Sequence, residues 1–358
     1  MKLFRSSLLC SSLFAGYVIA GSRIWQPPID DNAALQKRYF HVNPDANIRG
    51  YEATVWPDKT IRVCYRDRAT KDKFHLDLMA AHQIWVRAGL GEDFRIEAAS
   101  DADCADQEKL KDCLLVSTGD SLATTPGFPT EDSFRRKSGN RGPEMSLSDD
   151  QTIGMLSKVP NYAHELGHSI GLYHEHQNPN FWATGDQIKY AEGGTVFGPS
   201  NNNNWRCQNL KDYTSAVIGL VVQNPRGQQN VDRSDLCKDW AYAKSAGFSA
   251  GEYLPMPASL GFSQPGKTGG DVDWKSIMIY PSGAGAIDGS GDPEDPRMPI
   301  LLDHKGKRIP MNRSPSQLDI HAVRGMYGVK DSKGRQLLNK ARNFPKIYDL
   351  SKGTSGCL

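Results

Sequence analysis

The chain has 358 residues, with 43 basic and 41 acidic side chains and a net charge of +2 at pH 7. This balance excludes a nucleic-acid binder whose affinity depends on charge. Hydrophobic residues make up 38% of the chain, and its 34 glycines and 21 prolines are scattered without a repeat, which excludes collagen-like and wholly disordered proteins. After the N-terminal segment, no apolar stretch is long enough to span a membrane. We expect a globular protein with neither nucleic acid nor membrane as partner.

The first twenty residues have the pattern of a secretory signal. Lys2 and Arg5 give a basic start, an apolar run follows over 8–19, and small residues end at Ala20. A buried N-terminal helix is the alternative. We predict a signal peptide over 1–20 and a secreted, extracellular protein.

Polar residues without periodicity follow, and the dibasic pair at 37–38 is a site for a processing protease, so we expect a pro-segment over 21–54. The main domain is expected over 55–330. It begins with a turn and a strand within 55–65, and further strands are expected at 113–116 and 145–147. Apolar residues at helical spacing predict a helix lying on a sheet: Leu76, Met79, Ala80, Ile84 and Trp85.

Polar residues dominate from 180 to 270, so we expect a loop-rich insertion there. The two tryptophans of this insertion, Trp182 and Trp205, are expected to anchor its loops, and the alternative is that they line the cleft. A basic and polar tail is expected over 331–358.

Cysteine usage agrees with secretion. Once Cys10 leaves with the signal, an even number of cysteines remains, which indicates disulfide bonds whose pairing the sequence alone does not fix. We favour disulfide bonds between Cys104 and Cys113 and between Cys207 and Cys237, because each bond would close a short polar segment. A bond between Cys64 and Cys357 would then remain. None has zinc-finger spacing.

The most informative segment is NYAHELGHSIGLYHEH, residues 161–176. His164 and His168 are four apart, so on a helix both imidazoles project from one face and can bind one ion. Glu165 can act as base towards a metal-bound water. Gly171 can take a positive φ and end the helix, which lets His174 supply a third ligand. The alternative is a histidine-rich helix without metal, but chance rarely places all five residues at these offsets.

This string resembles the long zinc signature of the metzincin endopeptidases, and the continuation through Glu175 resembles the astacin family. The downstream segment SIMIY, 276–280, resembles the astacin Met-turn. The resemblance implies that Met278 packs beneath the imidazoles. It also implies that Tyr280 is a further zinc ligand that stabilises the oxyanion during turnover, and that Glu175 receives the mature N-terminus.

The resemblance covers about 55–328, where Ser316–Ile320 and the segment up to Gly328 resemble the closing helix of the astacin domain. It implies an α+β fold of the metzincin type in two lobes. The upper lobe would hold a twisted mixed sheet with helices, and the lower lobe would be largely irregular. An edge strand before the zinc helix would pair with the substrate, which points to Met145–Leu147.

The implied function is a secreted, monomeric, astacin-like zinc metalloendopeptidase with one catalytic Zn²⁺, acting on protein or peptide substrates and made as a zymogen. Glu165 would take the proton of the attacking water and pass it to the leaving amine. The alternatives are a catalytically silent zinc-binding adhesion module of the same fold, and a zinc hydrolase acting on other bonds.

Overall fold

The computed structural model describes residues 53–129, 142–223, 233–257 and 268–328. The predicted signal peptide, most of the predicted pro-segment, the tail over 331–358 and Cys357 lie outside the described residues. Within those ranges, no helix combines the length and the apolar character needed to cross a bilayer.

A five-stranded mixed sheet in the order β3-β2-β4-β7-β5 carries the first half of the fold. The first four strands run parallel, and β5 closes the sheet antiparallel to β7. A separate pair, β1 with β6, is antiparallel. The strands are β1 (Ala53–Thr54), β2 (Thr60–Tyr65), β3 (Arg95–Ala98), β4 (Leu114–Thr118), β5 (Ala123–Thr124), β6 (Phe128–Pro129) and β7 (Glu144–Leu147).

The strands expected within 55–65 and at 113–116 and 145–147 are present, but the expected edge strand is wrong. β7 lies inside the sheet, where Val116 pairs with Met145 on one side and Thr124 pairs with Met145 on the other. The edge strand on that side is β5, which has only two residues. A strand this short cannot show the alternation of apolar and polar residues by which strands are predicted. Val63, Leu114 and Met145 are all fully or almost fully buried, as expected for parallel strands covered on their faces.

Seven α-helices are described within these residues. They are α2 (Arg68–Ala88), α3 (Asp101–Ala105), α4 (Gln107–Leu110), α6 (Lys158–Ile170), α7 (Tyr213–Gln223), α8 (Trp240–Ser245) and α9 (Gln317–Met326). Short 3₁₀ helices lie between them: η2 (Pro57–Lys59), η3 (Glu175–Gln177), η4 (Pro179–Phe181), η5 (Thr184–Asp186), η6 (Cys207–Asn209), η7 (Arg233–Cys237) and η8 (Ser249–Glu252).

Helix α2 is present where the sequence predicts it, and its buried face agrees with the expected one only in part. Asp67 caps its first turn by accepting from the Thr70 amide, and Gly89 ends it at a φ of 111°. Leu78 and Trp85 are fully buried, whereas Leu76, which we expected on the apolar face, is 80% exposed. The expected apolar face is therefore confirmed at Ile84 and Trp85 and wrong at Leu76 and Ala80, which are exposed.

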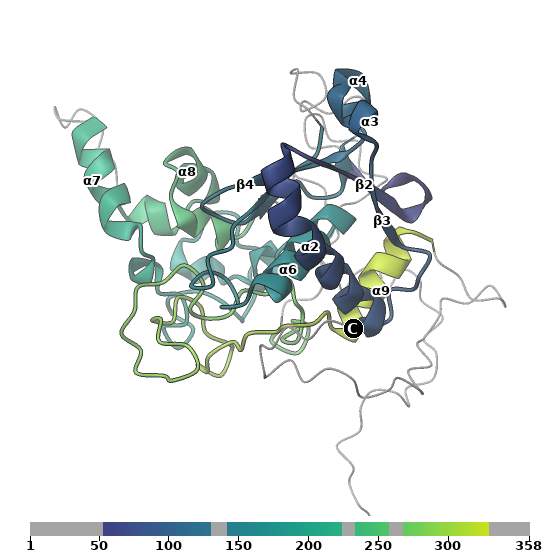
Figure 1. Cartoon of the computed structure of the whole chain (residues 1–358). Coiled ribbons are helices and arrows are strands. Elements are labelled where there is room, and N and C mark those ends of the chain that lie inside the picture. The colour runs from purple at the N-terminus through teal and green to yellow at the C-terminus, as the bar shows by residue number, and fades with distance from the viewer. Residues whose placement is uncertain (1–52, 130–141, 224–232, 258–267, 329–358) are drawn as a thin grey trace, which may run out of the picture. The chain divides into compact units, whose positions relative to one another are not determined.

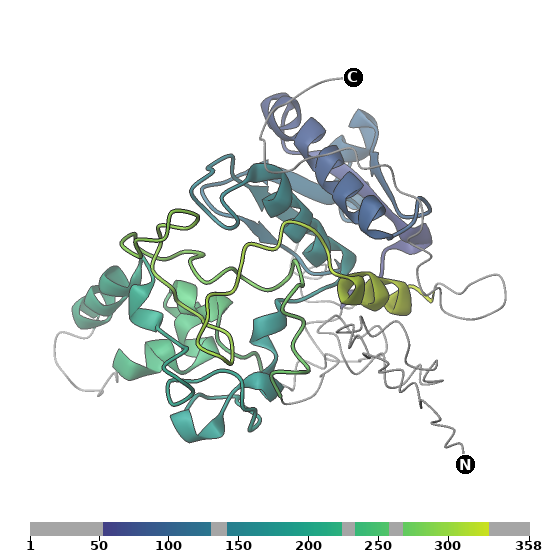
Figure 2. The ribbon, with the colours of Figure 1, turned by 90° about the horizontal axis from the view of Figure 1, so that it is seen from below.

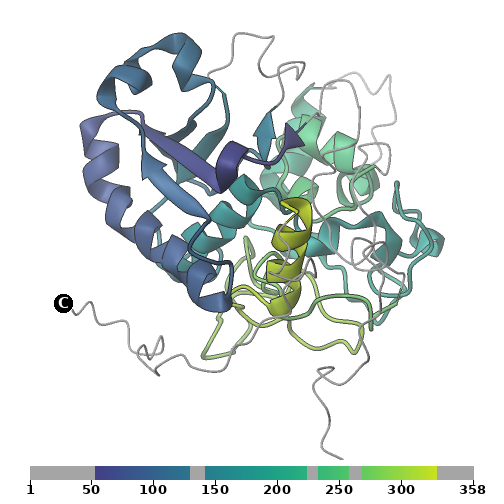
Figure 3. The ribbon, with the colours of Figure 1, turned by 90° about the vertical axis from the view of Figure 1, so that its right-hand side faces the viewer.

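Helices α2 and α6 run side by side next to the sheet (Figure 1). The indole Nε1 of Trp85 donates to the Ala163 carbonyl at 2.7 Å, which fixes α6 against α2. Helix α9 begins with a capping box between Ser316 and Asp319, and its Gln317 amide donates to the Ala88 carbonyl at the end of α2. Figure 3 shows α9, in yellow, near that end of α2. The zinc-signature helix is thus supported by the sheet side of the molecule.

The expected α+β class with a mixed sheet is confirmed, but the insertion is more than loops. Described residues between 181 and 254, together with part of the following chain, build a second apolar core, in which Trp182 and Trp205 are 0% and 4% exposed. Figure 2 shows α7 and α8 among loops rather than against the sheet. Sequence averages hid this core because its aromatic residues are spaced irregularly.

Two disulfide bonds are described. Cys207–Cys237, within the insertion, forms as predicted. The expected pairing of Cys104 with Cys113 is wrong: Cys104 bonds to Cys64 and so ties α3 to β2, while Cys113 is a buried free thiol. With Cys64 already paired, the expected bond from Cys64 to Cys357 is wrong as well.

Candidate metal centre

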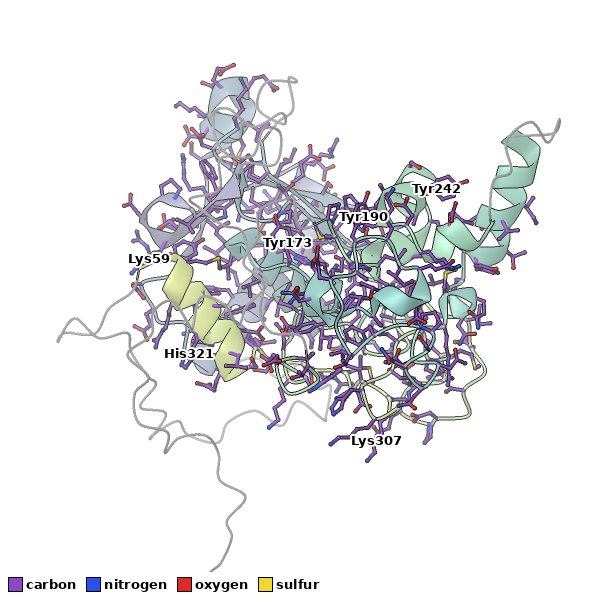
Figure 4. The ribbon with its side chains drawn as sticks, turned by 180° about the vertical axis from the view of Figure 1, so that it is seen from behind. Lys59, Tyr173, Tyr190, Tyr242, Lys307 and His321 are labelled. Atoms are coloured by element: carbon purple, nitrogen blue, oxygen red, sulfur yellow. A yellow bond between two sulfur atoms is a disulfide. The ribbon has the colours of Figure 1, made fainter. Side chains whose placement is uncertain are left out.

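The three histidines of the signature converge because the helix that carries two of them ends at a glycine. His164 and His168 lie one turn apart on α6. Gly171 has a φ of 127°, a value that L side chains rarely adopt, and its N–H reaches the Gly167 and His168 carbonyls. The chain therefore reverses, and His174 returns to face the helix. Tyr173, directly before it, marks this segment in Figure 4.

All three imidazoles are held by their Nδ1 atoms. Each Nδ1 lies 2.7–2.8 Å from an oxygen that can only accept, so each Nδ1 donates and each Nε2 keeps a bare lone pair. The acceptors are the Ile277 carbonyl for His164, the Leu172 carbonyl for His168 and the Gln177 side-chain Oε1 for His174.

The three Nε2 lone pairs point at one another. The His174 Nε2 lies 2.9 Å from that of His168 and 3.2 Å from that of His164. Two lone pairs cannot form a hydrogen bond, so the contact is unfavourable unless a cation lies between the rings. In a tetrahedral zinc site, Zn–N bonds of about 2.0–2.1 Å place neighbouring nitrogens about 3.3 Å apart. These three residues therefore fit a zinc ion.

Burial keeps these rings in the form that binds metal. It lowers the pKa of His164 to about 3 and of His168 to about 4, and it lowers the pKa of His174 well below its ordinary value, with neighbouring imidazoles adding to the effect. The rings are thus neutral at pH 7. A neutral imidazole is the state in which Nε2 binds a metal without first losing a proton.

Glu165 lies next to the first histidine on α6 and is only 4% exposed. The Thr124 hydroxyl on the edge strand β5 donates to its Oε2 at 2.6 Å. Burial raises the pKa of Glu165 to about 8, and this hydrogen bond acts in the opposite direction. A carboxyl group with a pKa near neutrality can both take up and release a proton at physiological pH.

Of the predicted Met-turn, Tyr280 lies against the histidine rings and Met278 lies against helix α6. The Tyr280 ring centroid is 4.3 Å from that of His174 and 5.5 Å from that of His164. Met278 is 2% exposed, and a Cβ at Gly167 would come within 2.4 Å of its sulfur. The absence of a side chain at Gly167 therefore allows the Met-turn to approach helix α6 closely.

Gln177 connects the third histidine to the insertion. Its Oε1 accepts from His174, and its Nε2 donates to the carbonyls of Gly251 and Leu254 at 3.0 and 3.1 Å. The neighbouring His176 donates from Nε2 to the Glu252 carbonyl at 2.9 Å. The amide of Gln177 is therefore oriented by two backbone acceptors, which fixes its oxygen towards the ligand.

Glu175 lies in a cluster of buried carboxyl groups. Its Oε1 accepts from the Asp273 amide at 3.1 Å, and Asp319 lies close by, accepting from the Ser276 hydroxyl and the Ile277 amide. Burial first, and the neighbouring carboxyl groups second, raise the pKa of Glu175 well above its ordinary value. Such a cluster favours protons or an added cation.

Sequence reasoning missed Thr124, Gly167 and Gln177. A glycine inside an apolar helix is a signal of close approach, so Gly167 was readable. Gln177 stands three positions after a ligand, where a supporting hydrogen bond is common but no residue type is required. Thr124 stands 41 positions before Glu165, and no local pattern relates the two.

No family model matches this sequence, and no curated protein matches it. Among the solved structures that resemble it are a hatching enzyme and myroilysin. High choriolytic enzyme 1, a hatching enzyme zinc-protease from Oryzias latipes (Medaka fish), is 13% identical, with a TM-score of 0.39 over 78% of this chain and 94% of that one. Myroilysin is 13% identical, with a TM-score of 0.38 over 77% and 97%.

Proposed function

We propose that this chain is a secreted zinc-dependent endopeptidase of the astacin type, acting on protein or peptide substrates. The observation that carries the proposal is the convergence of three neutral imidazole lone pairs beside a buried carboxyl group on the same helix. His164, His168 and His174 are the proposed ligands of one ion, and Tyr280 is a proposed fourth protein ligand.

The chemistry follows from the positions of the protein groups. A zinc ion in this site supplies Lewis acidity and lowers the pKa of a coordinated water towards about 7. Glu165 takes the proton from the attacking water and then gives it to the leaving amine. The Tyr280 phenol donates a hydrogen bond to the oxyanion, which its position over the imidazoles favours. Burial, followed by the carboxylates of Glu252 and Glu165, holds the pKa of Tyr280 well above its ordinary value, so the phenol keeps its proton.

We also propose that the protein is made as a zymogen, with a signal over 1–20 and a pro-segment over 21–54. Two observations bear on its activation. Ala53 and Thr54 pair with β6, so the chain joins the folded domain at the end of the proposed pro-segment. Glu175 lies among buried carboxyl groups that an ammonium group would stabilise, and we assign it to the N-terminus released by processing.

The test combines metal analysis with proteolysis. Secreted, processed protein is assayed for zinc content and for hydrolysis of casein, with and without a chelator. The variants are Glu165→Gln and, as a control, Glu92→Gln, whose side chain is exposed. We expect one zinc per chain and activity that is lost with chelator and in Glu165→Gln but kept in Glu92→Gln. A protein that binds zinc but is as inert as Glu165→Gln after cleavage behind Arg38 would be a silent zinc module, and the proposal would fail.

A further inference from the structure

The edge strand β5 approaches the zinc-signature helix and contacts its carboxylate directly. The Thr124 Oγ1 lies 2.6 Å from the Glu165 Oε2, a short bond typical of a hydroxyl donating to a carboxylate. Among the described residues, Thr124 is the one side chain seen to donate to this carboxylate. The two residues stand on different elements, so the bond joins the edge of the sheet to α6.

Thr124 is held in place from both sides. Its backbone pairs with Met145 of β7, and the next residue, Thr125, donates its amide to the Glu144 carbonyl at 2.9 Å. Three residues on, the Gly127 amide donates to the His168 carbonyl of α6 at 2.8 Å. The segment therefore keeps its distance from the helix, and the hydroxyl keeps its position relative to Glu165.

This bond affects how a base on α6 can work. A glutamate has three side-chain torsions, and a carboxylate has two oxygens that compete for any donor nearby. With Oε2 engaged by a β-branched residue whose χ1 is stiff, the plane of the carboxylate is set and Oε1 is left for the substrate water. A hydroxyl also donates best to the ionised form, which is the form that accepts a proton.

We propose that Thr124 is a positioning residue for Glu165, holding Oε2 so that Oε1 faces the attacking water. This inference rests on the proposed function, in which Glu165 is the base. Thr124 touches neither the metal ligands' Nε2 atoms nor the substrate in this role, so removing its hydroxyl affects turnover rather than metal binding.

The experiment uses the processed full chain with Thr124→Val, which keeps the shape and removes the donor, and Thr124→Ser, which keeps the donor. The control is Thr125→Val, which removes the hydroxyl that accepts from the Glu144 amide on the same strand end. A quenched fluorescent peptide built on a casein cleavage site gives kcat and KM. Competition with a chromophoric chelator gives the zinc Kd, and circular dichroism reports folding.

We expect Thr124→Val to lower kcat about 10- to 100-fold, the loss typical of a hydrogen bond to a charged group. KM and the zinc Kd should change less than about 3-fold, and Thr124→Ser should restore kcat to within about 3-fold. In the Glu165→Gln background, Thr124→Val should cause no further loss, because the base it positions is gone.

Three results would overturn the inference. They are a Thr124→Val kcat within about 2-fold of the unmodified protein, an equal loss in Thr125→Val, and a failure of Thr124→Ser to restore activity in a folded, zinc-loaded protein. If Thr124→Val does not fold, the comparison of Thr124→Ser with Thr124→Ala decides in the same way. Failure of the proposed function looks different, since the unmodified protein and Glu165→Gln would then be equally inert.

Discussion

Gln177 is the residue through which the insertion reaches the metal site, and its replacement should weaken zinc binding. Gln177→Met keeps the approximate volume and removes every hydrogen bond of the amide. The His174 Nδ1 then loses its acceptor at 2.8 Å, and two backbone carbonyls lose donors at 3.0 and 3.1 Å. The side chain is 4% exposed, so water replaces these partners poorly.

The expected size follows from the contacts. Loss of a hydrogen bond that orients a metal-bound histidine typically lowers metal affinity 10- to 100-fold, which is about 1.4–2.8 kcal/mol. The free energy of unfolding of the zinc-free protein should fall by about 3 kcal/mol, because three buried hydrogen bonds of about 1 kcal/mol each are lost. The matched control is Gln83→Met, on the exposed side of α2.

The assay is competition for zinc against a chromophoric chelator, on protein whose fold is checked by circular dichroism. A zinc Kd in Gln177→Met equal to that of the unmodified protein would refute the reasoning. So would an equal weakening in Gln83→Met, since that side chain is exposed on α2.

Three further predictions concern stability. Leu78→Ala should lower the free energy of unfolding by about 2–5 kcal/mol and Leu76→Ala by less than about 0.5 kcal/mol in urea titrations, because Leu78 is fully buried and Leu76 is 80% exposed; equal losses would contradict this. Burial, and after it the carboxylate of Asp273, raises the pKa of Asp319 to about 7. The protonated carboxyl group of Asp319 therefore contributes its whole stabilisation below the pKa of the unfolded state, and this contribution is lost as the pH rises through about 7. The melting temperature should therefore fall as the pH is raised from 4 to 8, and it should fall less steeply in Asp319→Asn. A melting temperature that rises over this range would contradict the prediction. Chelator should lower the melting temperature, and restored zinc should recover it; no shift refutes zinc binding.

The sequence predicted the helix that carries His164 and His168 well, because the spacing that predicts it is local. Residue spacing on one helix fixes the relative direction of His164 and His168, and Gly171 announces the reversal that brings back His174. The strands β2, β4 and β7 were predicted for the same reason, because a short apolar run between two turns is by itself typical of a buried strand.

The rest depends on relations between distant segments. Cys104 bonds to Cys64 rather than to the nearer Cys113 because β2 brings Cys64 beside α3. The edge strand β5 is two residues long and antiparallel, so it leaves no period, and Thr124 reaches Glu165 only through the folded sheet. The helix face of α2 was misjudged because Leu76 is apolar yet exposed.

The Met-turn connects the two apolar cores to the candidate metal centre. Ile277 and Met278 belong to the core of the sheet and its helices, whereas Ile279 belongs to the core of the insertion, with Tyr280 against it. The Ile277 carbonyl orients His164, and Gln177, fixed by the backbone of the insertion, orients His174. An ion bound by these rings would therefore have ligands that are oriented by hydrogen bonds from both cores. Its binding energy therefore also holds the two cores together, because it is available only when both are folded.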